Sequence, residues 1–174
     1  SLGHDWMFWK FGAVGSSNEL PEDSYQYLAM RGGKREVKKE LFYTQLCYSN
    51  EKARRDHINW LCDYLIEKPH IDFLHVWLGD DENNHCECEE CLKKRPSDWY
   101  VILLNEIDEK LRAKNLDTRI VFIAYTDTMF APQTERIRNP ERFSLLYAPI
   151  GRNYLSSIDE NAELPEAKPY TRNT

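Results

Sequence analysis

Three consecutive acidic side chains, Asp80, Asp81 and Glu82, follow Gly79 at the end of the apolar stretch 71–78. The stretch is rich in β-forming residues, which predicts a strand buried on both faces. In α/β folds, ligands bind in the loops that follow the carboxyl ends of strands. Glycoside hydrolysis needs one protonated and one ionised carboxyl group, and crowding separates the pKa values of neighbouring acids in this way. We therefore predict Asp80 and Asp81 as an acid/base pair with Glu82 as the alternative member, and a solvated acidic loop is the competing interpretation.

A cluster of possible metal ligands, His85, Cys86, Cys88 and Cys91, lies directly after these acids. Four nitrogen and sulfur ligands suit a structural zinc ion, although a site built from this loop alone is cramped and Cys47 is a possible additional ligand. Two alternatives stay open: a disulfide from Cys86 or Cys88 to Cys91 in an oxidising compartment, and free buried thiols. Zinc or a disulfide would hold the acidic loop in place.

Further polar and aromatic side chains follow the later predicted strands. Tyr125 and Asp127 come at the end of the stretch 118–125 and would face the same edge of a sheet as the acids. Asp127 is also a common turn former, which is its alternative role. The side chains that we predict to contact a sugar are Tyr125, Asp127, Tyr147, Arg152, Asn153 and, near the N-terminus, His4.

Strands and helices alternate along most of the chain. The predicted elements are strands at 41–48, 71–78, 118–125 and 143–148 and helices at 51–67 and from 96 to about 115. This order indicates right-handed βαβ crossovers and a parallel sheet, either a barrel or a doubly wound sheet. No Gly-x-Gly-x-x-Gly turn and no phosphate-binding P-loop motif occurs, which argues against a dinucleotide or P-loop nucleotide site.

The length restricts the choice of architecture. A complete eight-stranded barrel needs at least ~200 residues, and the chain has 174. We therefore predict the α/β class with a parallel (β/α) barrel of TIM type that is partial or a fragment of a larger barrel. We expect one domain over 1–174, truncated on its N-terminal side, with a peripheral tail at 161–174.

Composition excludes several partners. A net charge of −6 argues against binding to nucleic acid or to an anionic membrane surface. No apolar run approaches the ~18 residues of a membrane span, so no membrane insertion is expected. Aromatic residues make up 13% of the chain, which suits a carbohydrate ligand because sugars stack on exposed rings.

Several short motifs resemble one family in their order and spacing. They are Pro21-Glu22, Tyr27-Leu28-Ala29, Gly33-Lys34-Arg35, Gln45-Leu46-Cys47-Tyr48-Ser49-Asn50, Asp80-Asp81 and Cys86-x-Cys88-x-x-Cys91. The resemblance, over roughly residues 1–150, is to the family of domain of unknown function 4838, which is related to the α-glucuronidase and hexosaminidase barrels.

The resemblance implies a (β/α) barrel, a carbohydrate substrate and export in bacteria, so we expect an extracytoplasmic protein. The resemblance supplies no reaction. We also expect the chain to be part of a larger multidomain protein. The acid pair is similar to that of substrate-assisted hexosaminidases, in which one carboxylate orients an acetamido group and its neighbour is the general acid. Two other functions compete with a glycosidase: a non-catalytic carbohydrate-binding domain and a metal-stabilised structural domain of a larger enzyme.

Overall fold

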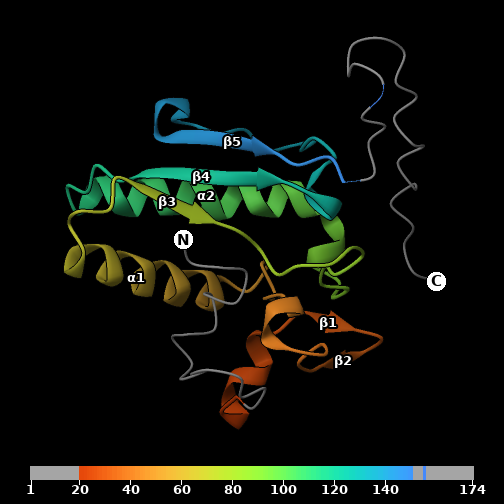
Figure 1. The fold of residues 1–174 in the computed structure, drawn as a ribbon. Coiled ribbons are helices and arrows are strands. Elements are labelled where there is room, and N and C mark those ends of the chain that lie inside the picture. The colour runs from red at the N-terminus through yellow and green to blue at the C-terminus, as the bar shows by residue number, and fades with distance from the viewer. Residues whose placement is uncertain (1–19, 151–154, 156–174) are drawn as a thin grey trace.

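A computed structural model describes residues 20–150 and residue 155. Its main body is a three-stranded parallel sheet of order β3-β4-β5 with two long helices beside it, and a short antiparallel hairpin, β1-β2, lies at one end (Figure 1). The elements are β1 (Met30–Arg31), β2 (Lys34–Arg35), α1 (Glu51–Glu67), β3 (Phe73–Val76), α2 (Pro96–Ala113), β4 (Arg119–Ala124) and β5 (Phe143–Tyr147). The fold is mixed α/β, and the described residues form no closed barrel.

Both helices begin where the sequence supplies a cap. The side chain of Asn50 accepts a hydrogen bond from the Ala53 amide at 3.0 Å and so satisfies one of the free donors in the first turn of α1. In α2, Pro96 occupies the first turn, and the Asp98 carboxylate accepts a bond from the Arg95 amide at 3.3 Å. Both predicted helices are confirmed.

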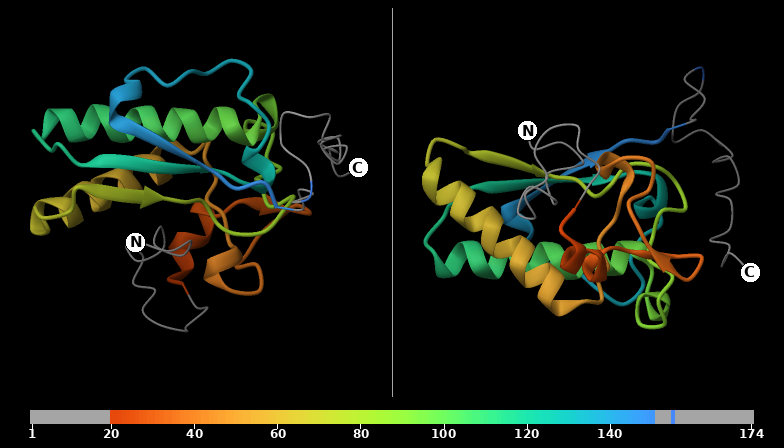
Figure 2. Two further views of the ribbon diagram at one scale, coloured as in Figure 1. Left: turned by 45° about the horizontal axis from the view of Figure 1, so that its top comes forward. Right: turned by 90° about the horizontal axis from the view of Figure 1, so that it is seen from below.

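The core lies between the sheet and the two helices, which cover the same face of the sheet (Figure 2). The side chains that meet there are Leu74, Val76, Ile120, Phe143, Leu61, Leu65, Leu104, Ile107 and Leu111. The prediction that the strand at 71–78 is buried on both faces is wrong: Leu74 and Val76 are buried, whereas Phe73 is 52% exposed. Burial alternates because the described helices cover only one face of the sheet.

The predicted strand at 41–48 is also wrong. Leu41–Tyr43 form a 3₁₀ turn, and Leu46 makes only a single antiparallel bridge, to Leu28. The segment lies across the carboxyl end of β3, where the Asp80 amide donates to the Phe42 carbonyl at 2.9 Å. This crossing buries the apolar side chains of the segment, which explains its strand-like composition. Its backbone nevertheless bonds to loops and not to a strand.

The carboxyl ends of the three parallel strands meet at one edge of the sheet. Phe73 is in register with Arg119, and Ile120 with Phe143, so the loops after β3 and β4 leave the sheet side by side. The outer edges of β3 and β5 carry no partner strand among the described residues. None of the described helices has the length and apolar character that crossing a membrane requires.

Candidate functional site

The loop after β3 and the turn after β4 form a network of polar contacts at this edge of the sheet. The 3₁₀ turn Thr126–Thr128 follows β4 directly. The side chain of Thr126 donates a hydrogen bond to the Asp81 carbonyl at 3.1 Å, which joins the two strand ends. The parallel register thus brings the predicted Asp80, Asp81, Tyr125 and Asp127 into one region.

Asp127 holds the loop after β3. Its carboxylate accepts hydrogen bonds from the amides of Asn83 at 2.7 Å and Asn84 at 2.8 Å, and it lies 3.2 Å from Nδ1 of His85. Burial opposes ionisation of Asp127, but the contacts with His85 and the two amides outweigh it and lower the pKa of the carboxyl group. Both carboxylate oxygens are therefore engaged by the protein itself.

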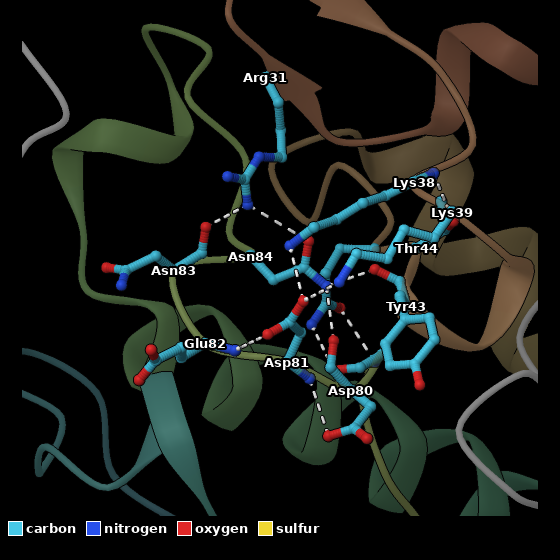
Figure 3. A network of polar contacts seen from close by, with 12 residues as sticks. Arg31, Lys38, Lys39, Tyr43, Thr44, Asp80, Asp81, Glu82, Asn83 and Asn84 are labelled. Atoms are coloured by element: carbon cyan, nitrogen blue, oxygen red, sulfur yellow. Dashed lines mark hydrogen bonds and ion pairs between the residues drawn. The ribbon is translucent and has the colours of Figure 1, made fainter.

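Asp81 is an ionised carboxylate between two cations. One of its oxygens lies 3.1 Å from the ammonium group of Lys38 and 3.6 Å from that of Lys39 (Figure 3). Burial raises the pKa of Asp81, but the Glu82 amide and the two lysines together bring it below its usual value. The side chain of Glu82 is exposed and points away from this group.

Asp80 has a different environment from Asp81. Its carboxylate accepts the Asp81 amide at 2.7 Å, and among the described residues it makes no ion pair. Burial, and then the nearby charge of this carboxylate, raises the pKa of the Tyr125 hydroxyl group. The structure therefore places a carboxyl group and a phenol next to each other at the ends of two adjacent strands.

The backbone is strained at the same place. Asp81, Asn83 and Thr126 have positive φ values of 93°, 50° and 43°, although none of them is glycine. Such conformations cost free energy and concentrate at binding and catalytic sites, where the surrounding contacts enforce them. Three of the five non-glycine residues with positive φ in the described part of the chain therefore lie at the ends of β3 and β4.

Four thiols meet beside this region. Cys47, Cys86, Cys88 and Cys91 place their sulfur atoms within 4.8 Å of one another, which is compatible with a metal ion. The Cys47 sulfur lies 3.7 Å from that of Cys88 and 3.8 Å from that of Cys91. All five cysteines, Cys62 included, are free thiols, so the structure contains none of the predicted disulfides.

Hydrogen bonds and a cation surround the four sulfur atoms. The Met30 amide donates to the Cys86 sulfur at 3.2 Å, and Ser49 Oγ lies 3.2 Å from the Cys91 sulfur and 3.3 Å from that of Cys47. The guanidinium group of Arg35 lies against Cys47.

These contacts shift the pKa values of the thiols in opposite directions. Hydrogen bonds from Cys86 and Cys91, and then from Ser49 and Arg35, lower the pKa of Cys47 despite its burial. The hydrogen bond to Cys47 raises the pKa of Cys86 to about 11, and the same partner raises that of Cys91 further. Among Cys47, Cys86 and Cys91, Cys47 is therefore the thiol that loses its proton first.

The group of possible metal ligands in the structure differs from the predicted one by one residue. Cys47, proposed from sequence as an additional ligand, stands in the four-thiol group, whereas His85 turns its ring toward Asp127. Sequence reasoning missed Lys38, Lys39 and Arg35. No spacing signal points to them, because their partners lie far along the chain.

The cavity at the strand ends is small. Its volume is about 40 Å³, which is room for a few water molecules and not for a sugar ring. Gly79, Asp81, Tyr125, Trp99 and Asp127 are among the residues that line it.

Of the remaining predicted sugar contacts, the structure describes Tyr147 alone. Tyr147 ends β5 and is 44% exposed. His4, Arg152 and Asn153 lie outside the described residues.

Comparisons with known proteins agree with the motifs in the sequence. No curated protein and no solved structure shows a significant match. One family model, described as Domain of unknown function (DUF4838), matches residues 6–173, which is nearly the whole chain. The chain, with its paired strand-end loops and its four-thiol group, therefore belongs to the DUF4838 family.

Proposed function

We propose that the loop joining β3 to α2 is a zinc-stabilised, ligand-binding loop of a glycoside hydrolase-like domain. One observation carries this proposal. Two separate networks fix the loop, one at Asp127 and one at the four thiols, and they leave the Asp80 carboxyl group beside Tyr125 at the strand ends. A loop held at two points presents a side chain to a ligand in one geometry.

The four thiols fit zinc. A tetrahedral zinc ion with Zn–S bonds of about 2.3 Å requires sulfur atoms about 3.8 Å apart, and two of the separations are 3.7 Å and 3.8 Å. Four thiolates fill the tetrahedron and leave no position for water, which is the pattern of a structural site. The zinc would hold the loop, and the chemistry would belong to the side chains.

Metal analysis of the purified protein tests the zinc site. We expect one zinc ion per chain, and we expect Cys47→Ser to lower both the zinc content and the affinity for zinc. Cys62→Ser is the matched control, since Cys62 is a buried thiol outside the group. His85→Ala should retain zinc; loss of zinc in this variant with full occupancy in Cys47→Ser would contradict the assignment.

The roles of the two acids follow from their surroundings. Asp81 has a lowered pKa and two lysine partners, so it is the ionised member that orients substrate or stabilises positive charge. We assign Asp80, which makes no ion pair among the described residues, as the proton donor to the leaving oxygen, with Tyr125 beside it. Glycans are the proposed substrates, and a larger extracytoplasmic protein is the proposed setting.

Hydrolysis of a panel of nitrophenyl glycosides, including N-acetylhexosaminides and glucuronides, tests this chemistry. Asp80→Asn should lower kcat by at least about a hundredfold. Asp117→Asn, an exposed acid at the opposite end of β4, should leave it unchanged. If no glycoside is hydrolysed while glycans still bind, the domain is a carbohydrate-binding domain without catalysis.

A partial (β/α) barrel is the architecture that we propose for this function. Three parallel strands with helices on one face correspond to a section of such a barrel. The unpaired outer edges of β3 and β5 would be joined to further strands in a closed barrel.

A further inference from the structure

We infer that the metal centre controls the position of the Asp80 turn, and that Arg31 transmits this control from the β1-β2 hairpin. The inference rests on the proposed zinc site. It adds a regulatory connection between two groups of residues, the four thiols and the strand-end acids.

The first step joins the thiols to β1. The Cys86 sulfur accepts the Met30 amide at 3.2 Å, and the Met30 carbonyl accepts the Glu87 amide at 2.8 Å. The side chain of Glu87 accepts the Gly32 amide at 2.7 Å. The cysteine-containing loop thus binds successive backbone groups of the hairpin.

The second step joins β1 to the acidic turn. Arg31 directs its guanidinium group to the Asn83 carbonyl and to Oδ1 of Asn84, the latter at 3.3 Å (Figure 3). The Asn84 side chain is buried, and its amide group donates to the Asp80 carbonyl at 2.7 Å and to the Tyr43 carbonyl. Arg31 therefore contacts the residue that holds the backbone of Asp80.

The hairpin depends on these contacts for its position. Its two strands pair over only two residues each, Met30 with Arg35 and Arg31 with Lys34. A two-stranded hairpin is marginally stable by itself in water. Contacts with the cysteine-containing loop therefore help to hold this one in place, together with the Ala29 amide, which donates to the Gln45 carbonyl at 2.8 Å. Loss of the metal would free that loop, release the hairpin and remove Arg31 from the acidic turn.

Amide hydrogen exchange of the intact chain, followed residue by residue by NMR, tests the connection. The reporters are the amides of Asn83 and Asn84, which are bonded to Asp127 and lie outside the ligand set. Zinc-loaded protein is compared with protein stripped by a chelator under reducing conditions. We expect stripping to accelerate exchange at both reporters by at least tenfold, while the amides of Leu104 and Ile107 in α2 stay protected.

Arg31→Gln with zinc still bound separates transmission from unfolding. This variant should keep one zinc per chain and still accelerate exchange at Asn83 and Asn84 by at least tenfold. Lys34→Gln, which removes an exposed cation from the other strand of the hairpin, is the matched control and should change neither zinc content nor exchange.

Three outcomes can be distinguished. If the protein binds no zinc, both the proposed metal site and this inference are wrong. If zinc binds but its removal leaves exchange at the reporters unchanged, the metal stabilises only the cysteine-containing loop. In that case the zinc site stands and the coupling is wrong. If Arg31→Gln behaves like Lys34→Gln, Arg31 is not the transmitting residue. If stripping also accelerates exchange at the α2 amides, removal of zinc has unfolded more than the loop. Exchange in the zinc-loaded Arg31→Gln protein then tests the coupling by itself.

Discussion

Gly79 is the residue at which the segment before α1 approaches the end of β3 most closely. A Cβ atom added there would lie 2.4 Å from the Thr44 carbonyl oxygen, which belongs to the backbone and cannot rotate away. We predict that Gly79→Ala lowers the free energy of unfolding by about 2–3 kcal/mol, because the two segments must separate. Urea unfolding of the purified protein measures the loss.

The matched control at this scale is Gly33→Ala. Gly33 has a positive φ of 78° but open space where a Cβ would lie, so backbone strain of about 1 kcal/mol is the only cost. An equal loss of stability in the two variants would show that the Thr44 contact does not constrain the site.

The site residues differ in how far sequence predicts them. Asp80 and Asp81 are predicted from their place after an apolar stretch, and in the structure they lie in the loop that follows β3. Their different surroundings were not predictable, because Lys38 and Lys39 reach Asp81 from a separate segment that crosses the strand end. Charge pairing between distant segments leaves no local pattern in the chain.

At the scale of elements, Asp98 fastens the long connection after β4 to the first turn of α2. Its buried carboxylate accepts the amides of Thr134 at 2.8 Å and Glu135 at 2.9 Å. Burial opposes ionisation of Asp98, but these amides, with those of Gln133 and Arg95, lower its pKa. Its stabilising effect is therefore complete above the unfolded-state pKa of about 3.9 and is lost as the pH falls through the lower folded-state pKa.

We predict that Asp98→Asn lowers the free energy of unfolding by about 2 kcal/mol at pH 7, since charged hydrogen bonds are lost. The difference from wild type should shrink as the pH falls below the unfolded-state pKa of about 3.9. Urea unfolding at several pH values measures it, and Asp117→Asn should show no such pH-dependent difference. A constant difference across the whole pH range would mean that Asp98 does not titrate with a lowered pKa.

The elements also show where sequence patterns succeed. Both helices were predicted, because caps and helical periodicity are local signals, and the strands at 118–125 and 143–148 are confirmed within a residue or two as β4 and β5. The strand predicted at 41–48 is wrong. Its apolar composition indicates that the segment is buried, but does not indicate which backbone groups the segment bonds to. Leu41 and Leu46 are as buried as strand residues, yet they lie in a crossing loop.

At the scale of the whole molecule, the metal should contribute to global stability. A ligand that binds only the folded state at a concentration a hundredfold above its Kd adds about 2.7 kcal/mol. For a chain of this length, we predict that a chelator lowers Tm by about 5–10 °C. Scanning calorimetry under reducing conditions measures the shift.

The variant Cys47→Ser supplies the comparison. Its Tm should already be low and should respond little to the chelator, whereas Cys62→Ser should respond as the wild type does. A chelator effect of the same size in Cys47→Ser would place the responsible metal elsewhere.

The four-thiol group also determines how the chain is connected in space. Cys47 and Cys91 are 44 positions apart, and the chain between them contains all of α1 and β3. A metal that joins them closes a ring of the polypeptide, and a covalent cross-link of that span would remove conformational entropy worth about 4 kcal/mol from an unfolded chain. Unlike a disulfide, this ring opens when the metal leaves. The availability of metal, rather than the redox state of the surroundings, would then decide whether the polypeptide behaves as a closed ring or as an open chain.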